Sequence, residues 1–259
     1  MTLFDARSLA RGWLSVALAS SSDDDRPALH RTISIEAYPE GLRLTATDSF
    51  MLLTCWVPNL DDDLATPPSI DEPPYSTAVA MDPHARAKGF LAHAAKLAKA
   101  LGPDADPLPV QVRLGVIDDS EPDDGLVAFD GFEVPYVHLE LPDGAERLKL
   151  RCYEGPFPNW RPILSGFTPE ATDRITLNPD IVGRLAEIDK IQPGCYLRFR
   201  WGGTIGAAHV ETHQASPHVQ GIVMPVRWDF ARNEPRTDTA PEDGTPADDA
   251  DTTEDGTDG

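Results

Sequence analysis

The chain has 259 residues, 41% of them hydrophobic, so it can bury a core as one large domain or two ordinary ones. Its formal net charge of −21 argues against a chain that is basic overall and binds nucleic acid with its whole surface. Net charge does not say where the charges lie, so an acidic chain can still have a local basic face that contacts nucleic acid. Three cysteines without a CxxC pair favour reduced thiols in a cytoplasmic setting, and no metal or redox site.

The N-terminal segment has features of a weak signal peptide, because Arg7 and Arg11 precede a short apolar run. Asp5 and the helical spacing of the apolar residues favour an amphipathic helix over residues 5–19 instead. No stretch is long and apolar enough to span a membrane, so we expect no membrane partner.

A first unit of one strand, one helix and several strands occupies residues 1–58. Its first strand covers residues 2–4, and the helix over 5–19 follows. Ile33, Ile35 and Ala37 alternate with polar neighbours, and a turn at 39–41 leads to further strands up to residue 58. Residues 59–74, rich in Asp and Pro, are predicted to be a linker.

The same order of elements recurs twice more. The second unit, residues 75–155, has a predicted strand at 77–80 and a helix that starts at Asp82-Pro83 and ends at Leu101. Its later strands are predicted at 109–117, 125–140 and 147–153. The third unit is predicted to contain a strand at 174–177, a helix to about Lys190, and strands at 195–201, 205–213 and 218–227.

The C-terminal tail, residues 231–259, differs from everything before it. It holds ten acidic residues and two arginines, so it contributes −8 of the net charge, and it has no aromatic residue and no Ile, Leu or Val. Such a segment cannot bury enough apolar surface to offset the entropy of ordering, which predicts disorder.

The helix over 82–101 has a charge pattern opposite to that of the whole chain. It carries four basic residues and no acid after Asp82. At about 100° per residue, Phe90, Leu91, Ala94, Leu97, Ala98 and Leu101 fall on one side, and Lys88, Lys96 and Lys99 on the other. Arg86 flanks the basic side. A basic face of this kind is typical of non-specific phosphate contact, although an ordinary solvated helix face has the same pattern.

A metal site is a rival interpretation. His209, Glu211 and His213 alternate along a predicted strand and would face one way, and two His with one carboxylate suit iron or zinc. Three residues along one strand are poorly placed to enclose a metal, so a solvated strand face is the favoured interpretation. No nucleophile motif or phosphate-binding glycine loop is present, and we therefore expect no enzyme activity and no cofactor.

Three short stretches resemble the bacterial DNA polymerase III beta subunit, the DNA sliding clamp. LTATDSFMLL at 44–53 is similar to that family's ATDGHRL stretch, and FPNWRPIL at 157–164 to its FPDYRRVLP stretch. IVMPVR at 222–227 resembles the VMPMR with which those clamps end. The three occur in the family's order, and the resemblance covers about residues 1–228.

The resemblance implies an α+β DNA-clamp fold of repeated β-α-β-β-β units, with basic helices inside a ring and sheets outside. Residues 1–165 would form one clamp domain of two units, and residues 166–230 a half-domain. The implied protein is a homo-oligomeric ring that encircles double-stranded DNA and tethers a polymerase. Its implied DNA-binding residues are Arg7, Arg11, Arg86, Lys88, Lys96, Lys99 and Arg184.

The resemblance also implies a pocket that binds short peptides of the DNA polymerase and the clamp loader. Its residues would be Thr47, Leu52, Pro158, Ile163, Ile222, Met224 and Val226. Phe50, Met51 and Pro162 depart from the family's stretches and make this pocket more apolar.

The chain has three units where the family has six, so the number of copies in a ring stays open. Twelve units would need four copies. The shortened form favours a phage-encoded clamp, acting in a bacterial cytoplasm or an infected host. A clamp-like interaction protein that does not encircle DNA is the alternative.

Overall fold

The computed structural model describes residues 2–21, 23, 25–60, 67–81, 86–102, 105–116, 135–172, 175–203, 206–226, 228–229 and 234–235. The predicted helix start at Asp82-Pro83, residues 125–134 of a predicted strand and most of the predicted disordered tail lie outside these residues. Within the tail, the described residues Glu234–Pro235 pair with Trp228–Asp229.

Most helices and strands of the described residues follow the predicted order, but the short elements at Arg161–Ser165, Trp228–Asp229 and Glu234–Pro235 were not predicted. The helices are α1 (Ala6–Ala17), α2 (Arg86–Leu101), α3 (Arg161–Ser165) and α4 (Pro179–Ile191), with short 3-10 turns at Ala28–Arg31 and Pro142–Gly144. The strands are β1 (Thr2–Asp5), β2 (Thr32–Tyr38), β3 (Gly41–Thr47), β4 (Met51–Pro58), β5 (Ser76–Met81), β6 (Pro109–Val116), β7 (Pro135–Glu140), β8 (Arg147–Arg151), β9 (Tyr196–Trp201), β10 (Ala208–His213), β11 (Val219–Val223), β12 (Trp228–Asp229) and β13 (Glu234–Pro235).

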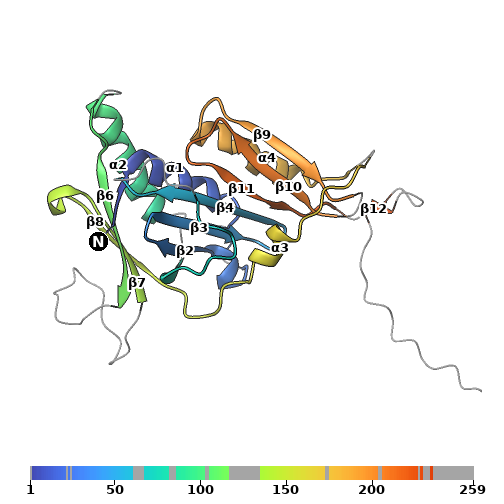
Figure 1. The fold of residues 1–259 in the computed structure, drawn as a ribbon, viewed down its shortest axis with the longest axis horizontal. Helices are drawn as coiled ribbons and strands as arrows, with labels where there is room; N and C mark the ends of the chain where they lie inside the picture. Colours follow the sequence, from blue (N-terminus) through green and yellow to red (C-terminus); the bar gives the residue numbers. More distant parts are fainter. Residues whose placement is uncertain are drawn as a thin grey trace, which may run out of the picture.

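Two antiparallel sheets organise the chain (Figure 1). The larger has the strand order β5-β2-β3-β4-β11-β10-β9, and the smaller has the order β1-β6-β7-β8. Their antiparallel ladders, together with the helices on them, confirm the expected α+β class.

The first two units exchange their first strands. The strand β1 precedes α1 but pairs with β6, whereas β5 precedes α2 but pairs with β2. The ends of the units are related in the same way: the Leu60 amide donates to the Leu3 carbonyl at 2.8 Å, and the Tyr153 amide to the Val79 carbonyl at 2.7 Å. Each unit therefore completes the sheet of the other.

The third unit joins the first through β11, which pairs with β4. The predicted strand at 174–177 is wrong for its described residues 175–177, which form no strand. Within the part described, no neighbouring strand lies beside them, and Thr176 only accepts a hydrogen bond from the Val226 amide at 2.8 Å. The strand predicted at 218–227 ends at Val223, because Pro225 has no amide to continue a ladder.

The helices α1 and α2 pack on each other, and α1 covers one face of the larger sheet. Gly12 allows this approach, because a Cβ there would lie 2.7 Å from Val57. The predicted apolar side of α2 is correct for Phe90, Leu91, Ala94 and Ala98, which are buried. It is wrong for Leu97 and Leu101, which lie exposed at the border of the packed stripe. Among the described helices, none is long and apolar enough to cross a membrane.

Candidate nucleic-acid interface and partner surface

Three helices enclose a hollow of about 680 Å³ whose charged lining is entirely cationic. Arg7 and Arg11 line it from α1, Lys99 from α2 and Lys190 from α4. The remaining lining is apolar, from Ala10, Leu14, Ala95 and Ile191, and no acidic side chain belongs to it. Because α1 contacts both α2 and α4, basic residues that are far apart in the sequence share one surface. A cluster of this kind attracts polyanions even on a chain of net charge −21.

The other predicted cations of α2 are exposed but lie outside the lining of this hollow. Arg86, Lys88 and Lys96 project into solvent, on a helix whose described residues include no acid. Lys88 and Lys99 are eleven residues apart, which is close to three helical turns, so they share a stripe. The helix thus extends the cationic surface beyond the hollow.

Two predicted DNA-binding arginines are engaged within the fold. The Arg7 guanidinium donates to the carbonyls of Ala98 and Gly102, and so fastens α1 to the C-terminal end of α2. Arg184 forms an ion pair of 2.7 Å with Asp48 and donates to the Leu18 carbonyl at 3.1 Å. Arg184 therefore ties α4 to the first unit, and its charge is largely balanced.

Two of the seven predicted pocket residues, Leu52 and Ile222, belong to a small apolar cluster separate from the main core. Leu52 and Ile222 lie directly opposite each other in the β4–β11 ladder and are buried. Trp160 and Leu164, on the segment that crosses the sheet, cover them. These four side chains form a closed floor.

Exposed apolar side chains lie at the edge of this floor. Ile163 is 49% exposed on α3, which contacts β11, and Met224 is 41% exposed just after β11. Phe50 is 50% exposed, and its carbonyl accepts a hydrogen bond from the Met224 amide at 2.8 Å. These three large apolar residues, here named the junction patch, present a surface that a partner's apolar side chain can cover.

The remaining predicted pocket residues have other positions. Thr47 is buried opposite Leu52 in the β3–β4 ladder, so it shares the face of the floor. Pro158 lines a different hollow, described next. Val226 is half-buried, and its amide bonds to Thr176 of the third unit.

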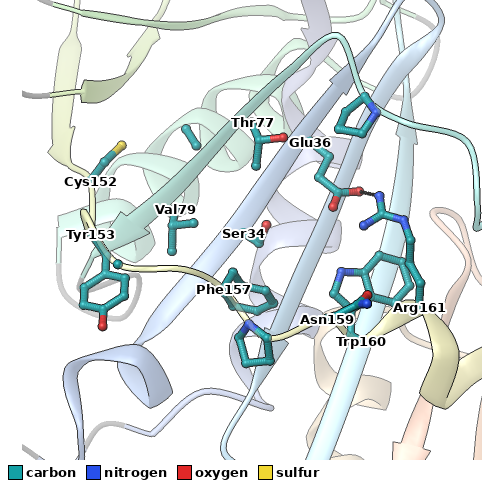
Figure 2. A pocket seen from close by; sticks show the side chains of 14 residues that line it. Ser34, Glu36, Thr77, Val79, Cys152, Tyr153, Phe157, Asn159, Trp160 and Arg161 are labelled. Carbon is teal, nitrogen blue, oxygen red and sulfur yellow. Dashed lines mark hydrogen bonds and ion pairs between the residues drawn. The ribbon is translucent and has the colours of Figure 1, made fainter.

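The second hollow, of about 510 Å³, lies between β2, β5 and the segment 152–161 (Figure 2). At one end Arg161 pairs with Glu36 at 2.7 Å, as the dashed line in Figure 2 marks. The Tyr38 hydroxyl joins this network, and the Arg161 side chain also donates to the Ile70 carbonyl at 2.7 Å. Burial and the neighbouring Glu36 raise the pKa of Tyr38, so it stays a neutral donor. The network fixes the crossing segment and the linker on the sheet.

The proposed metal ligands do not meet. His209 is buried and stacks on Phe167, with ring centroids 5.4 Å apart. Glu211 faces Arg198 and Arg200 at 3.4 and 3.6 Å, and His213 is exposed at the end of β10. Throughout the residues that the structure describes, no three His, Cys, Asp or Glu side chains gather where they could hold a metal ion.

The predicted list omitted two residues that the structure places at these surfaces. Lys190 shares α4 with Glu187, which it contacts at 2.6 Å, so the mixed charges of the helix hid its place beside Arg11 and Lys99. Trp160 is 1% exposed, with the Arg161 guanidinium 4.8 Å from its ring centroid. The FPNWRPIL stretch contained this tryptophan, but nothing in the sequence shows that it is a floor residue.

Comparison with solved structures identifies the fold. A protein assigned as a DNA polymerase III beta subunit of Eubacterium rectale is 9% identical, and the match covers 87% of this chain and 65% of that chain at a TM-score of 0.50. The sliding clamp (DNA polymerase III subunit beta) of Pseudomonas aeruginosa, solved bound to griselimycin, is 13% identical over 87% of this chain and 64% of that one, also at 0.50.

The chain thus spans less than two thirds of the length of either solved chain. No protein-family model and no curated protein sequence matches it. The antiparallel sheets, the helices on them and the two structural matches lead to one conclusion: the chain has the fold of the sliding clamps.

Proposed function

We propose that this protein is a DNA sliding clamp. In this proposal it is a ring of several copies that encircles duplex DNA, tethers a polymerase and catalyses no reaction itself. The observation that carries the proposal is the hollow between α1, α2 and α4, whose four charged lining residues are all cations. It lies in a chain that has the clamp fold.

The chemistry of the hollow fits the DNA backbone and not a base sequence. Lysine and arginine on helices contact phosphates without reading base edges, and such contacts let a protein move along DNA. The described helices α1 and α2 carry no acid within their bounds, whereas α4 carries Asp180, Glu187 and Asp189, so phosphates meet the least repulsion beside α1 and α2. The excess negative charge lies elsewhere, a large part of it in residues 231–259.

Charge reversal in the hollow tests this part of the proposal. Arg11→Glu combined with Lys99→Glu should lower the affinity for a closed duplex and reduce the slope of log affinity against log salt by roughly two, about one per lost phosphate contact. The matched control is Arg113→Glu with Arg151→Glu, an equal charge change at exposed positions of the smaller sheet. Equal losses in both double variants would mean that only net charge matters, and the DNA proposal would fail.

The second part of the proposal assigns the junction patch of Phe50, Ile163 and Met224 to partner peptides. Apolar side chains beside a closed apolar floor suit an anchor residue of a short peptide, and a methionine adapts to several partners. The clamp loader would use the same surface. We place the protein in the cytoplasm of a bacterium or of a phage-infected cell.

A further inference from the structure

The first two units show how a sheet of this fold is completed. After each helix comes a strand, β2 or β6, whose outer edge is covered by the first strand of the other unit. Covering this edge satisfies backbone groups that would otherwise be free to pair with another chain. All seven residues of β2 are buried as a result.

The third unit has the same elements but no partner unit in the described chain. Its strand β9 follows α4 as β2 follows α1, yet β9 is the last strand of the larger sheet. Its residues alternate between exposed and half-buried, and Leu197, Phe199 and Trp201 on the core side stay half-buried. Residues 175–177, which precede α4 as β1 precedes α1, have no strand beside them in the part described.

We infer that a second copy of this chain completes the third unit by strand exchange. Residues 175–178 of each copy pair with β9 of the other, as β1 pairs with β6 and β5 with β2. The two copies are related by a two-fold axis, because each gives one strand and receives one. Together the two third units form one domain like that of the first two units.

The β1–β6 ladder supplies the register. There Asp5, the N-cap of α1, lies opposite Pro109, the first residue of β6. The N-cap of α4 is Asn178 and the first residue of β9 is Tyr196, so the same rule places Asn178 opposite Tyr196 of the second copy. Leu177 then lies opposite Leu197, Thr176 opposite Arg198, and Ile175 opposite Phe199.

This register matches the faces of the two strands. Residues directly opposite in a ladder share one face of the sheet. Ile175 and Leu177 pack on the core side, as do Phe199 and Leu197. A shift by one residue would place Leu177 opposite Tyr196, which is 64% exposed on the other face. The pairing therefore covers the half-buried side chains of β9.

The rest of the third unit is compatible with the exchange. Among the described residues, the edge of β9 is occupied only at its end, where the Glu170 amide donates to the Trp201 carbonyl at 2.7 Å. The inferred pairing ends at Phe199 and does not need that carbonyl. Val182, four residues after the N-cap Asn178, is 44% exposed, whereas Leu9, four residues after the N-cap Asp5, is fully buried. A second α4 can cover Val182 by packing on α4, as α2 packs on α1.

Disulfide trapping between separately tagged chains tests the register. In a Cys195→Ser background, Thr176→Cys on a long-tagged chain and Arg198→Cys on an untagged chain are mixed, refolded together and oxidised. We expect a covalent species of mixed size on a non-reducing gel, because opposite residues bring their Cα atoms within disulfide range. Arg200→Cys in place of Arg198→Cys is the matched control, two residues along the same face, and should give at most about a tenth of that product.

The mass of the full chain in solution gives the second readout, without DNA and hence independent of the proposed clamp function. We expect at least two copies at micromolar concentration. Ile175→Pro removes an amide that faces the second copy in this register, because the Thr176 carbonyl on the opposite side is taken by Val226. It should weaken the association at least about tenfold, whereas Ile175→Val should keep it. A monomeric wild-type chain, or equal trapping at Arg198 and Arg200, would overturn the inference. Dimers that do not bind DNA would leave it standing and count only against the clamp function.

Discussion

The first two units and the third unit share one order of elements but differ in how far they are covered. In the first pair, exchanged strands cover the outer edges of β2 and β6, and α1 packs on α2. In the described part of the third unit, β9 pairs with β10 alone and its core-side residues stay half-buried. The difference shows that one unit of this fold cannot cover its own strand edge and needs a second unit to complete its sheet. Its stability depends on a partner unit, from the same chain or from another copy.

The largest expected effect comes from truncating matched residues in the two regions. Phe4 is fully buried in the exchanged strand β1, so Phe4→Ala should cost about 3–5 kcal/mol of unfolding free energy. Leu177 precedes α4 at the matching position but is half-buried, so Leu177→Ala should cost about 1–2 kcal/mol in a dilute monomer. Denaturant unfolding at two protein concentrations measures both. Equal costs at low concentration would break the comparison.

The ion pair between β2 and the crossing segment has the next largest effect. Arg161→Ala leaves Glu36 buried without its partner, which should cost about 3 kcal/mol. Arg161→Met combined with Glu36→Gln removes both charges, and it should cost less than the two single changes together. Chemical unfolding of the three variants measures this coupling. Strictly additive costs would show that the network does not fix the segment on the sheet.

The junction patch between the two regions should respond in binding more than in stability. Met224 is 41% exposed, so Met224→Ala should barely change the melting temperature. It should weaken the binding of a polymerase-derived peptide at least about tenfold, because the substitution removes part of the site for an anchor residue. Fluorescence anisotropy with the labelled peptide measures the affinity. Deletion of residues 236–259 is the control and should leave it unchanged. If Met224→Ala instead unfolds the protein and leaves the peptide affinity of the remaining folded protein unchanged, Met224 is a core residue and not part of a binding site.

The smallest expected effect is a pH dependence in the third unit. Burial, and then the nearby Arg200, lower the pKa of His209 below the ordinary 6.5. The unfolded chain therefore binds a proton more readily than the folded one, and stability should fall as the pH drops below about 6.5. His209→Gln should make thermal unfolding depend less on pH in that range. His213→Gln, at an exposed position of the same strand, is the control and should follow the wild type.

Local patterns in the sequence determined the elements and the α+β class. Alternation in residues 32–58 and the period of Leu9, Trp13 and Val16 identified β2 to β4 and α1, because successive residues of a strand point to opposite faces and an apolar helix face repeats every three to four residues. Short motifs led to the clamp family, and the structural matches confirm its fold. The basic side of α2 was also predictable, since its lysines are exposed as expected.

Only the tertiary structure decided which strands pair and which cations meet. The sequence places β1 and β5 before their helices, but the exchange between units depends on strand edges from 39 residues (Ala37 and Ser76) to 110 residues (Thr2 and Val112) away. The tertiary structure brings Lys190 next to Arg11 and Lys99 because α1 contacts both α2 and α4. The tertiary structure also pairs Arg184 with Asp48, a partner that no local pattern indicates. The physical reason is that periodicity reports the burial of a face, whereas pairing and charge neutralisation depend on contacts distant in the chain.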